Sequence, residues 1–137
     1  MNLLFIYISE WGTFNYGVAS ISAVLKQAGH SISFRYIDPG ISPADFKKDL
    51  LGKISGYDGY LISSVTDSFE CAKTIIPLIR EVSPQSAIIL GGIHATIAPE
   101  EAIAVDGITA ICIGEGEYAI NEFFQHWSNG PTSSVFD

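Results

Sequence analysis

Cationic residues are scarce in this chain. It contains seven Lys and Arg residues against fifteen Asp and Glu residues, and its formal net charge is −8. Contacts from Lys and Arg to phosphate groups supply most of the non-specific affinity of proteins for nucleic acids. The charge balance therefore excludes DNA or RNA as the main partner.

Long hydrophobic runs are also missing. No apolar segment approaches the roughly 20 residues that a membrane-spanning helix needs, so we expect no membrane partner. Met1 and Asn2 lead directly into the apolar run Leu3–Ile8, without the basic segment or the cleavage site of a secretory signal. We interpret this run as a first strand.

Cysteine is rare, and the spacing of Cys71 and Cys112 fits no metal site. Both residues lie in apolar, periodic surroundings, which indicates buried free thiols in a reducing compartment. We therefore expect a cytoplasmic protein in which this chain supplies no metal ligands.

Five short apolar runs alternate with five helical patterns along the chain. The expected strands are Leu3–Ile8, Ser31–Ile37, Gly59–Val65, Ala87–Leu90 and Ala110–Ile113. The expected helices cover residues 18–28, 42–56, 67–82, a short stretch from residue 99, and 117–127. This alternation predicts an α/β fold of the doubly wound, flavodoxin-like (Rossmann-like) class. In that fold a five-stranded parallel sheet of order 2-1-3-4-5 forms the middle of a three-layer sandwich.

Two further expectations concern the organisation of the chain. Pro77 lies inside a helical pattern, which predicts a kink or a shortened helix. Residues 1–127 are expected to form one domain, whereas residues 128–137 lose all periodicity and read as a linker or tail.

Two of the expected strands break directly into glycines, in the segments IILGGIHATI (88–97) and ICIGEGEY (111–118). Parallel strands deliver their C-terminal loops to one edge of the sheet, and ligands bind there in the crevice between strands one and three. Small residues dominate the loops at that edge: Gly12, Thr13, Gly17, Ser63, Ser64, Gly91, Gly92 and Ala95. The pattern favours a ligand lying on backbone, although each glycine taken singly could simply allow a strand to turn into a helix.

The segment Gly114–Ala119 (GEGEYA) formally matches the dinucleotide fingerprint G-x-G-x-x-G/A. It follows the fifth strand, however, and not the first. Glu115 and Glu117 also occupy the helix N-terminus that a pyrophosphate would need, and they would repel a second anion. This loop therefore suits a ligand rich in amide donors, or none.

His94 follows the double glycine and has two open interpretations. It is either a ligand contact or a hydrogen-bonded structural group, and ligation of a metal by it is the least favoured role. His30 and His126 lie near helix ends and are read as solvated.

The pair G-G-x-H-x-T-x-x-P-E-E (91–101) and G-E-G-E (114–117) resembles the N-terminal cobalamin-binding domain of cobalamin-dependent radical S-adenosylmethionine enzymes. The resemblance covers most of the chain. It implies that cobalamin lies across the C-terminal edge of the sheet, with its nucleotide tail beside strands three and four. The cofactor contacts that we expect on this basis are Gly12, Thr13, Ser63, Ser64, Val65, Thr66, Gly91, Gly92, His94, Ala95, Gly114, Glu115 and Gly116.

Two motifs of related proteins are absent from this sequence. The D-x-H-x-x-G histidine that ligates cobalt in other cobalamin proteins is missing, so any cobalamin is expected to bind without it. The C-x-x-x-C-x-x-C motif of the radical centre is missing too. The resemblance then implies that this chain is not catalytic alone. Its partner would be a downstream radical S-adenosylmethionine domain in the same polypeptide, which would hold a four-iron, four-sulfur cluster and S-adenosylmethionine.

Two other functions stay open at this point. A degenerate domain that only packs against its neighbour would fill the crevice with its own bulky side chains, for which Trp11, Phe14 and Tyr16 are available. A flavodoxin-like electron carrier would need a phosphate loop rich in Ser and Thr after the first strand, and residues 10–13 (EWGT) are a poor version of one.

Overall fold

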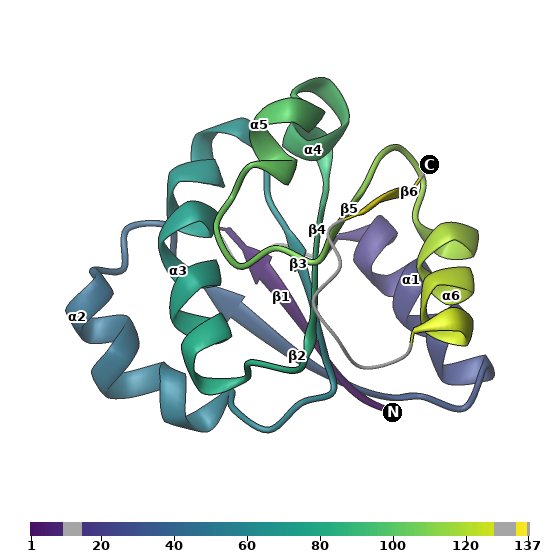
Figure 1. The fold of residues 1–137 in the computed structure, drawn as a ribbon, viewed down its shortest axis with the longest axis horizontal. Helices are drawn as coiled ribbons and strands as arrows, with labels where there is room; N and C mark the ends of the chain where they lie inside the picture. Colours follow the sequence, from purple (N-terminus) through teal and green to yellow (C-terminus); the bar gives the residue numbers. More distant parts are fainter. Residues whose placement is uncertain (10–14, 128–133, 137) are drawn as a thin grey trace.

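The computed structural model describes residues 1–9, 15–127 and 134–136. Its strands form one parallel sheet in the order β2-β1-β3-β4-β5-β6 (Figure 1). The strands are β1 (Asn2–Ile8), β2 (Ser31–Ile37), β3 (Gly59–Ser63), β4 (Ala87–Gly91), β5 (Ala110–Cys112) and β6 (Ser134–Phe136). The first five confirm the predicted strand order 2-1-3-4-5.

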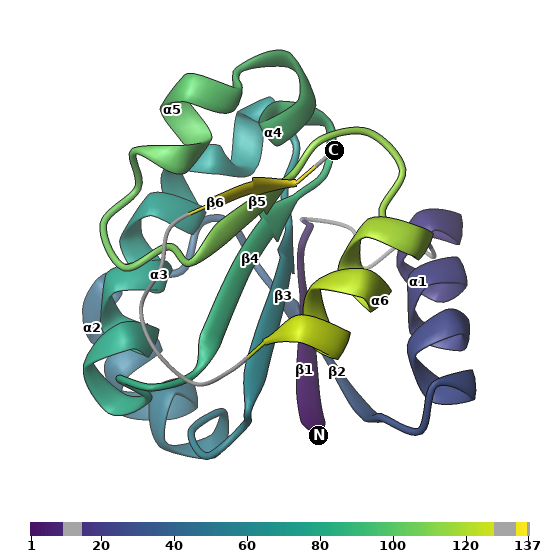
Figure 2. The ribbon, with the colours of Figure 1, turned by 45° about the vertical axis from the view of Figure 1, so that its right-hand side comes forward.

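Helices connect successive strands and cover both faces of the sheet (Figures 1 and 2). The α-helices are α1 (Tyr16–Gln27), α2 (Pro43–Asp45), α3 (Phe69–Val82), α4 (Ile93–Ile97), α5 (Pro99–Ile103) and α6 (Glu117–His126). A π-helical turn (Phe46–Leu50) and two 3-10 turns (Leu51–Lys53 and Thr66–Ser68) complete the connections.

The alternation of side chains along β1 shows how the three layers form. Leu3 and Phe5 point into the apolar cluster beneath α1 and α6, whereas Leu4, Ile6 and Ile8 join the cluster beneath α3. Successive side chains of a strand point to opposite faces, so a continuously apolar strand is one that is covered on both sides. The central strands are therefore buried, and their C-terminal ends emerge together at one edge.

Three details differ from the sequence-based expectations. Helix α3 continues through Pro77 to Val82, so it is not shortened. Helix α4 begins directly after Gly92, where no helix was expected. Strand β6 lies within the segment that reads as a linker or tail, and it pairs in parallel with β5. Its pairing with the exposed side of β5, a long-range contact, has no local signal in the sequence.

Arg80 holds the edge of the sheet opposite the crevice. Its guanidinium donates to the carbonyl oxygen of Gly107 at 2.8 Å, to that of Ser86 at 2.7 Å and to Thr109 Oγ1 at 2.9 Å. Thr109 Oγ1 in turn accepts from the backbone N–H of Ile88 at 2.9 Å. One side chain of α3 thereby fixes the loops that enter β4 and β5.

Candidate functional site

A cavity of about 450 Å³ opens at the C-terminal ends of β1, β3, β4 and β5, between α1 and α6. The chain turns away from β1 in two directions at this point, because β2 lies on one side of β1 and β3 lies on the other. Crevices at such switch points are the usual ligand sites of open α/β sheets. The cavity therefore lies where the sequence predicts a ligand.

The floor of the cavity is apolar and its rim is polar. Side chains of three adjacent strands form the floor: Phe5, Leu61 and Ile89. Ser63, Ser64 and Thr96 stand at the rim. An apolar slot with a few hydroxyl groups at its mouth suits a ligand that has one flat, apolar part and one hydrogen-bonding part.

Gly92 is required by the protein's own backbone. Its φ is +98°, and a Cβ atom there would lie 2.5 Å from the carbonyl oxygen of Ser64. Both facts favour glycine whether or not a ligand is present. A substitution at Gly92 would therefore displace the end of β3, and it cannot report on a ligand alone.

Gly91 differs, because a side chain there has room. Its Cβ would meet Cys112 Cβ at 3.6 Å, an ordinary contact. Strand alternation aims this position toward the face that carries Ile89 and Cys112, both of which line the cavity. A larger residue at Gly91 would thus project into the space that a ligand would use.

The Ser64 hydroxyl is a buried polar group without a partner. Ser64 is 1% exposed, and its Oγ makes no hydrogen bond to the residues that the structure describes. A buried hydroxyl left unpaired is costly, so such a group calls for an explanation. Because Ser64 lines the cavity, a ligand atom placed there would supply the missing bond.

Thr96 ties the two glycine-containing loops together. Its Oγ1 donates to the carbonyl oxygen of Gly92 at 3.2 Å and accepts from the N–H of Gly114 at 2.9 Å. Thr96 also lines the cavity. It was part of the recognised motif but not of the expected contact set, because the distance between the two loops is a tertiary property.

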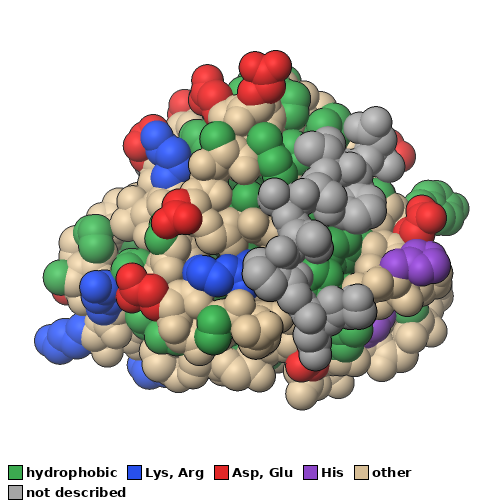
Figure 3. Space-filling view, viewed as in Figure 1, with side chains coloured by type: hydrophobic (Ala, Val, Ile, Leu, Met, Phe, Trp, Pro, Cys, Tyr) green, Lys and Arg blue, Asp and Glu red, His purple; other side chains and the backbone are tan. Residues whose placement is uncertain are grey.

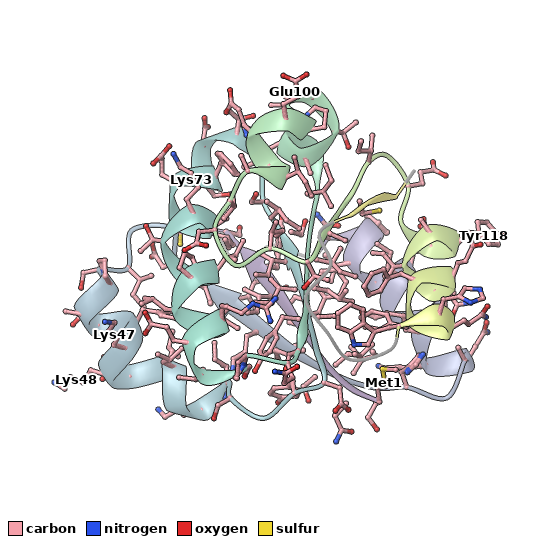
Figure 4. The ribbon with its side chains drawn as sticks, viewed as in Figure 1. Met1, Lys47, Lys48, Lys73, Glu100 and Tyr118 are labelled. Carbon is pink, nitrogen blue, oxygen red and sulfur yellow. The ribbon has the colours of Figure 1, made fainter. Side chains whose placement is uncertain are left out.

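Apolar and acidic side chains alternate around the mouth of the cavity. Val65, Ile93 and Ile97 line it while remaining 39%, 62% and 66% exposed. Glu115 and Glu117 stand on the side of α6. Tyr118, which follows them, is 88% exposed and points away from the domain (Figure 4). A cover over this mouth would gain apolar contact and meet two carboxylates.

His94 lies behind the cavity wall. It is 4% exposed, its ring stacks on Phe69 at a centroid distance of 3.8 Å, and its Nδ1 is 3.3 Å from Thr66 Oγ1. Its Nε2 lies 3.5 Å from a carboxylate oxygen of Glu101. These contacts agree with the structural interpretation of His94, in which the ring joins the loops after β3 and β4.

The structure brings most of the expected contact residues together. Those that line the cavity are Ser63, Ser64, Val65, Gly91, Gly92, Gly114, Glu115 and Gly116. Thr66, His94 and Ala95 lie in the same loops but do not line it, and Gly12 and Thr13 fall outside the described residues. Sequence reasoning missed the apolar floor and the α1 side, namely Phe5, Tyr7, Asn15, Val18, Ile21, Leu61, Ile89 and Ile120. Their periodicity indicates only burial.

Tyr16 does not fill the crevice as the packing-only interpretation requires. It is 84% exposed and does not line the cavity. Trp11 and Phe14, the other candidates for this role, lie outside the described residues, as does the loop 10–13 that an electron carrier would use.

The described residues hold no group of three or more His, Cys, Asp or Glu side chains placed to bind a metal ion. Both cysteines are buried and unpaired. Burial raises the pKa of Cys71 to about 11 and also raises the pKa of Cys112, so neither thiol is activated. Within the described part of the chain, no helix is long and apolar enough to span a bilayer.

Three comparisons place this architecture among known proteins. The family model of the B12 binding domain matches residues 12–124. Two structures of the cobalamin-dependent S-adenosylmethionine radical enzyme OxsB match 90% of this chain with a TM-score of 0.66 and 19% identity. One holds aqua-cobalamin and S-adenosylmethionine, and the other holds aqua-cobalamin. This chain spans 18% of the OxsB chain.

A C2-type ketoreductase of a modular polyketide synthase matches all of this chain and 39% of its own, with a TM-score of 0.61 and 10% identity. No curated protein sequence matches significantly. At these identities the structural matches establish the shared fold.

Proposed function

This chain belongs to the B12-binding domain family, and from that membership we propose that its cavity receives the nucleotide tail of a cobalamin. The observation that carries the proposal is the Ser64 hydroxyl, which is buried in the cavity wall without a partner. A hydrogen-bonding group of the tail would complete this site. The residues present therefore fit the cofactor that the family is named for.

The shape and polarity of the cavity support the same assignment. The flat base of the tail would lie between the apolar side chains of the floor, while Ser63 and Ser64 bind its polar part. The corrin ring would cover Val65, Ile93 and Ile97, whose exposed apolar surface would then be buried. Glu115 and Glu117 would accept hydrogen bonds from the corrin amides, which agrees with the rejection of a pyrophosphate at this loop.

The geometry of His94 bears on how cobalt is held. Its ring is engaged by Phe69 and Thr66 and does not line the cavity. The D-x-H-x-x-G motif is absent from the sequence. We therefore propose that cobalamin binds here without an imidazole ligand from the protein. Contacts from Gly12, Thr13, Thr66, His94 and Ala95 remain predictions.

In the full protein we propose that this domain serves a radical S-adenosylmethionine domain in the same polypeptide, which would hold the iron–sulfur cluster and S-adenosylmethionine. Bound cobalamin supplies a carrier for a methyl group or a means of stabilising a reactive intermediate. The residues of this chain bind and orient the cofactor and exclude water from its tail, and none of them is catalytic. The likeness of fold to OxsB supports this arrangement, and the free thiols agree with a cytoplasmic location.

Retention of hydroxocobalamin tests the proposal. Purified protein mixed with hydroxocobalamin should elute from gel filtration with bound cofactor and a shifted visible spectrum. Gly91→Leu should abolish retention, because the new side chain enters the cavity. Gly52→Leu is the matched control, since Gly52 is exposed, away from the cavity, and has no atom within 4 Å of its Cβ position.

Circular dichroism should show that both variants fold, and Gly91→Ala provides a smaller perturbation if Gly91→Leu does not. Colourless protein at every loading would refute cobalamin binding by this chain and favour the packing-only domain. Equal retention by the wild type and a folded Gly91→Leu variant would refute the placement of the tail.

A further inference from the structure

Strand β2 forms an open edge of the sheet. It pairs with β1 over all seven of its residues, and no other described strand pairs with it. Its sequence, SISFRYI, contains no proline that would block further pairing. Alternate N–H and C=O groups of such an edge point outward and are available to another strand.

One face of β2 is an aromatic ladder that ends in a groove. Ile32, Phe34 and Tyr36 line a groove of about 220 Å³ together with residues of α1. Phe34 and Tyr36 contact each other at a ring-centroid distance of 4.8 Å, and they remain 39% and 44% exposed. Large exposed aromatics of this kind usually mark a surface that another molecule covers.

The electrostatics of this edge differ from those of the rest of the chain. Residues 15–37, which form α1 and β2, contain Lys26 and Arg35 but no Asp or Glu, although the chain has fifteen acidic residues. Lys26 lines the groove, and strand alternation places Arg35 on the opposite face of β2. On the face shown in Figure 3, carboxylates gather instead at the end that carries α4 and α5. Glu100 lies there (Figure 4).

We propose that β2 accepts an extended protein segment that alternates apolar and acidic residues, as an added strand of the sheet. Apolar side chains of that segment would pack on Phe34 and Tyr36, and its carboxylates would face Arg35. Backbone pairing gives such complexes their affinity, and alternate side chains give them their specificity. This inference does not depend on cobalamin binding.

A second copy of this chain does not fit the same edge as well. Antiparallel pairing of two β2 strands would bring Phe34 to Phe34, but β2 contains no carboxylate to meet Arg35. Nucleic acid is disfavoured by the net charge of −8. The charge pattern therefore selects an acidic, strand-forming partner.

Fluorescence anisotropy with two labelled synthetic peptides tests the proposal. One peptide alternates valine and glutamate, and the other alternates valine and lysine. The protein should bind the glutamate peptide more tightly, and binding should increase the protection of residues 31–37 from hydrogen exchange. Arg35→Glu should weaken this binding about threefold to tenfold, because an attractive cross-strand pair becomes repulsive, and should improve binding of the lysine peptide.

Lys53→Glu is the matched charge control, since Lys53 is exposed and lies outside the groove. It should change neither affinity by more than a small factor. Equal binding of the two peptides, equal effects of the two variants, or absence of binding would overturn the proposal. A dimer in sedimentation velocity that Phe34→Ser dissociates would overturn it in favour of a second copy.

Discussion

Replacing Ser64 with alanine should affect stability and cofactor binding in opposite directions. The Ser64 hydroxyl is buried and unpartnered, so the free protein carries the cost of that group without a compensating hydrogen bond. An unsatisfied buried hydroxyl costs about 1–3 kcal/mol, and the open cavity reduces that cost by admitting solvent. We expect Ser64→Ala to leave the free energy of unfolding unchanged or to raise it by about 1 kcal/mol.

The same substitution should weaken cobalamin binding. One hydrogen bond contributes a net 0.5–1.5 kcal/mol, which corresponds to a loss of roughly twofold to twelvefold in affinity. Functional sites often hold groups that are unfavourable in the free protein, because the ligand supplies their partners. Opposite signs for the two changes would be the signature of such a group.

Urea denaturation and absorbance titration with hydroxocobalamin measure the two quantities, and Ser68→Ala is the matched control. Ser68 is also buried, but its Oγ accepts from the N–H of Val65 at 3.1 Å and donates to the carbonyl oxygen of Val65 at 3.2 Å. Its removal should lower the free energy of unfolding by about 1–2 kcal/mol. The reasoning fails if Ser64→Ala destabilises the protein as much as Ser68→Ala does, or if it leaves the affinity for cobalamin unchanged.

Three further predictions concern stability. Gly92→Ala should lower the free energy of unfolding by at least about 2 kcal/mol in the absence of any ligand, because its φ of +98° and the carbonyl oxygen of Ser64 exclude a side chain; a neutral result would contradict the geometry. Arg80→Ala should lower the melting temperature by roughly 10 °C, since it strands several backbone acceptors, whereas a drop of only a degree or two, measured calorimetrically, would show that these bonds contribute little. Burial raises the pKa of Cys71 from 9.0 to about 11, so the unfolded thiol ionises first and stability should fall as the pH rises from 9 to 11. Urea titrations across that window should lose up to about 2–3 kcal/mol, and Cys71→Ala should flatten the slope; an unchanged slope in that variant would assign the effect to another group.

The fold was largely predictable because its signals are local. Continuous apolar runs such as Leu3–Ile8 mark strands that are covered on both faces, and the structure places that run in β1. The expected edge position of residues 31–37 followed from their alternation and is confirmed. The outcome at Pro77 could not be read from the pattern, because packing of α3 on the sheet decides whether a helix tolerates proline.

The candidate site was predictable in part. The glycine-containing loops after β4 and β5 do meet at one cavity, as parallel topology requires. The role of Gly92 was not predictable, because the contact of its backbone with Ser64 joins residues far apart in the sequence. His94 could equally have faced the cavity, and its stacking on Phe69 depends on how α3 lies against the loop.

The sequence by itself determined the class of the fold, the edge at which a ligand would bind and the exclusion of nucleic acid as main partner. It could do so because periodicity, glycine placement and charge act locally or sum over the whole chain. Only the tertiary structure decided that Ser64 has no partner, that Gly91 has room and Gly92 has none, and that β2 presents aromatic rings beside a strip free of carboxylates. Each of those properties is a distance between segments, and packing sets such distances.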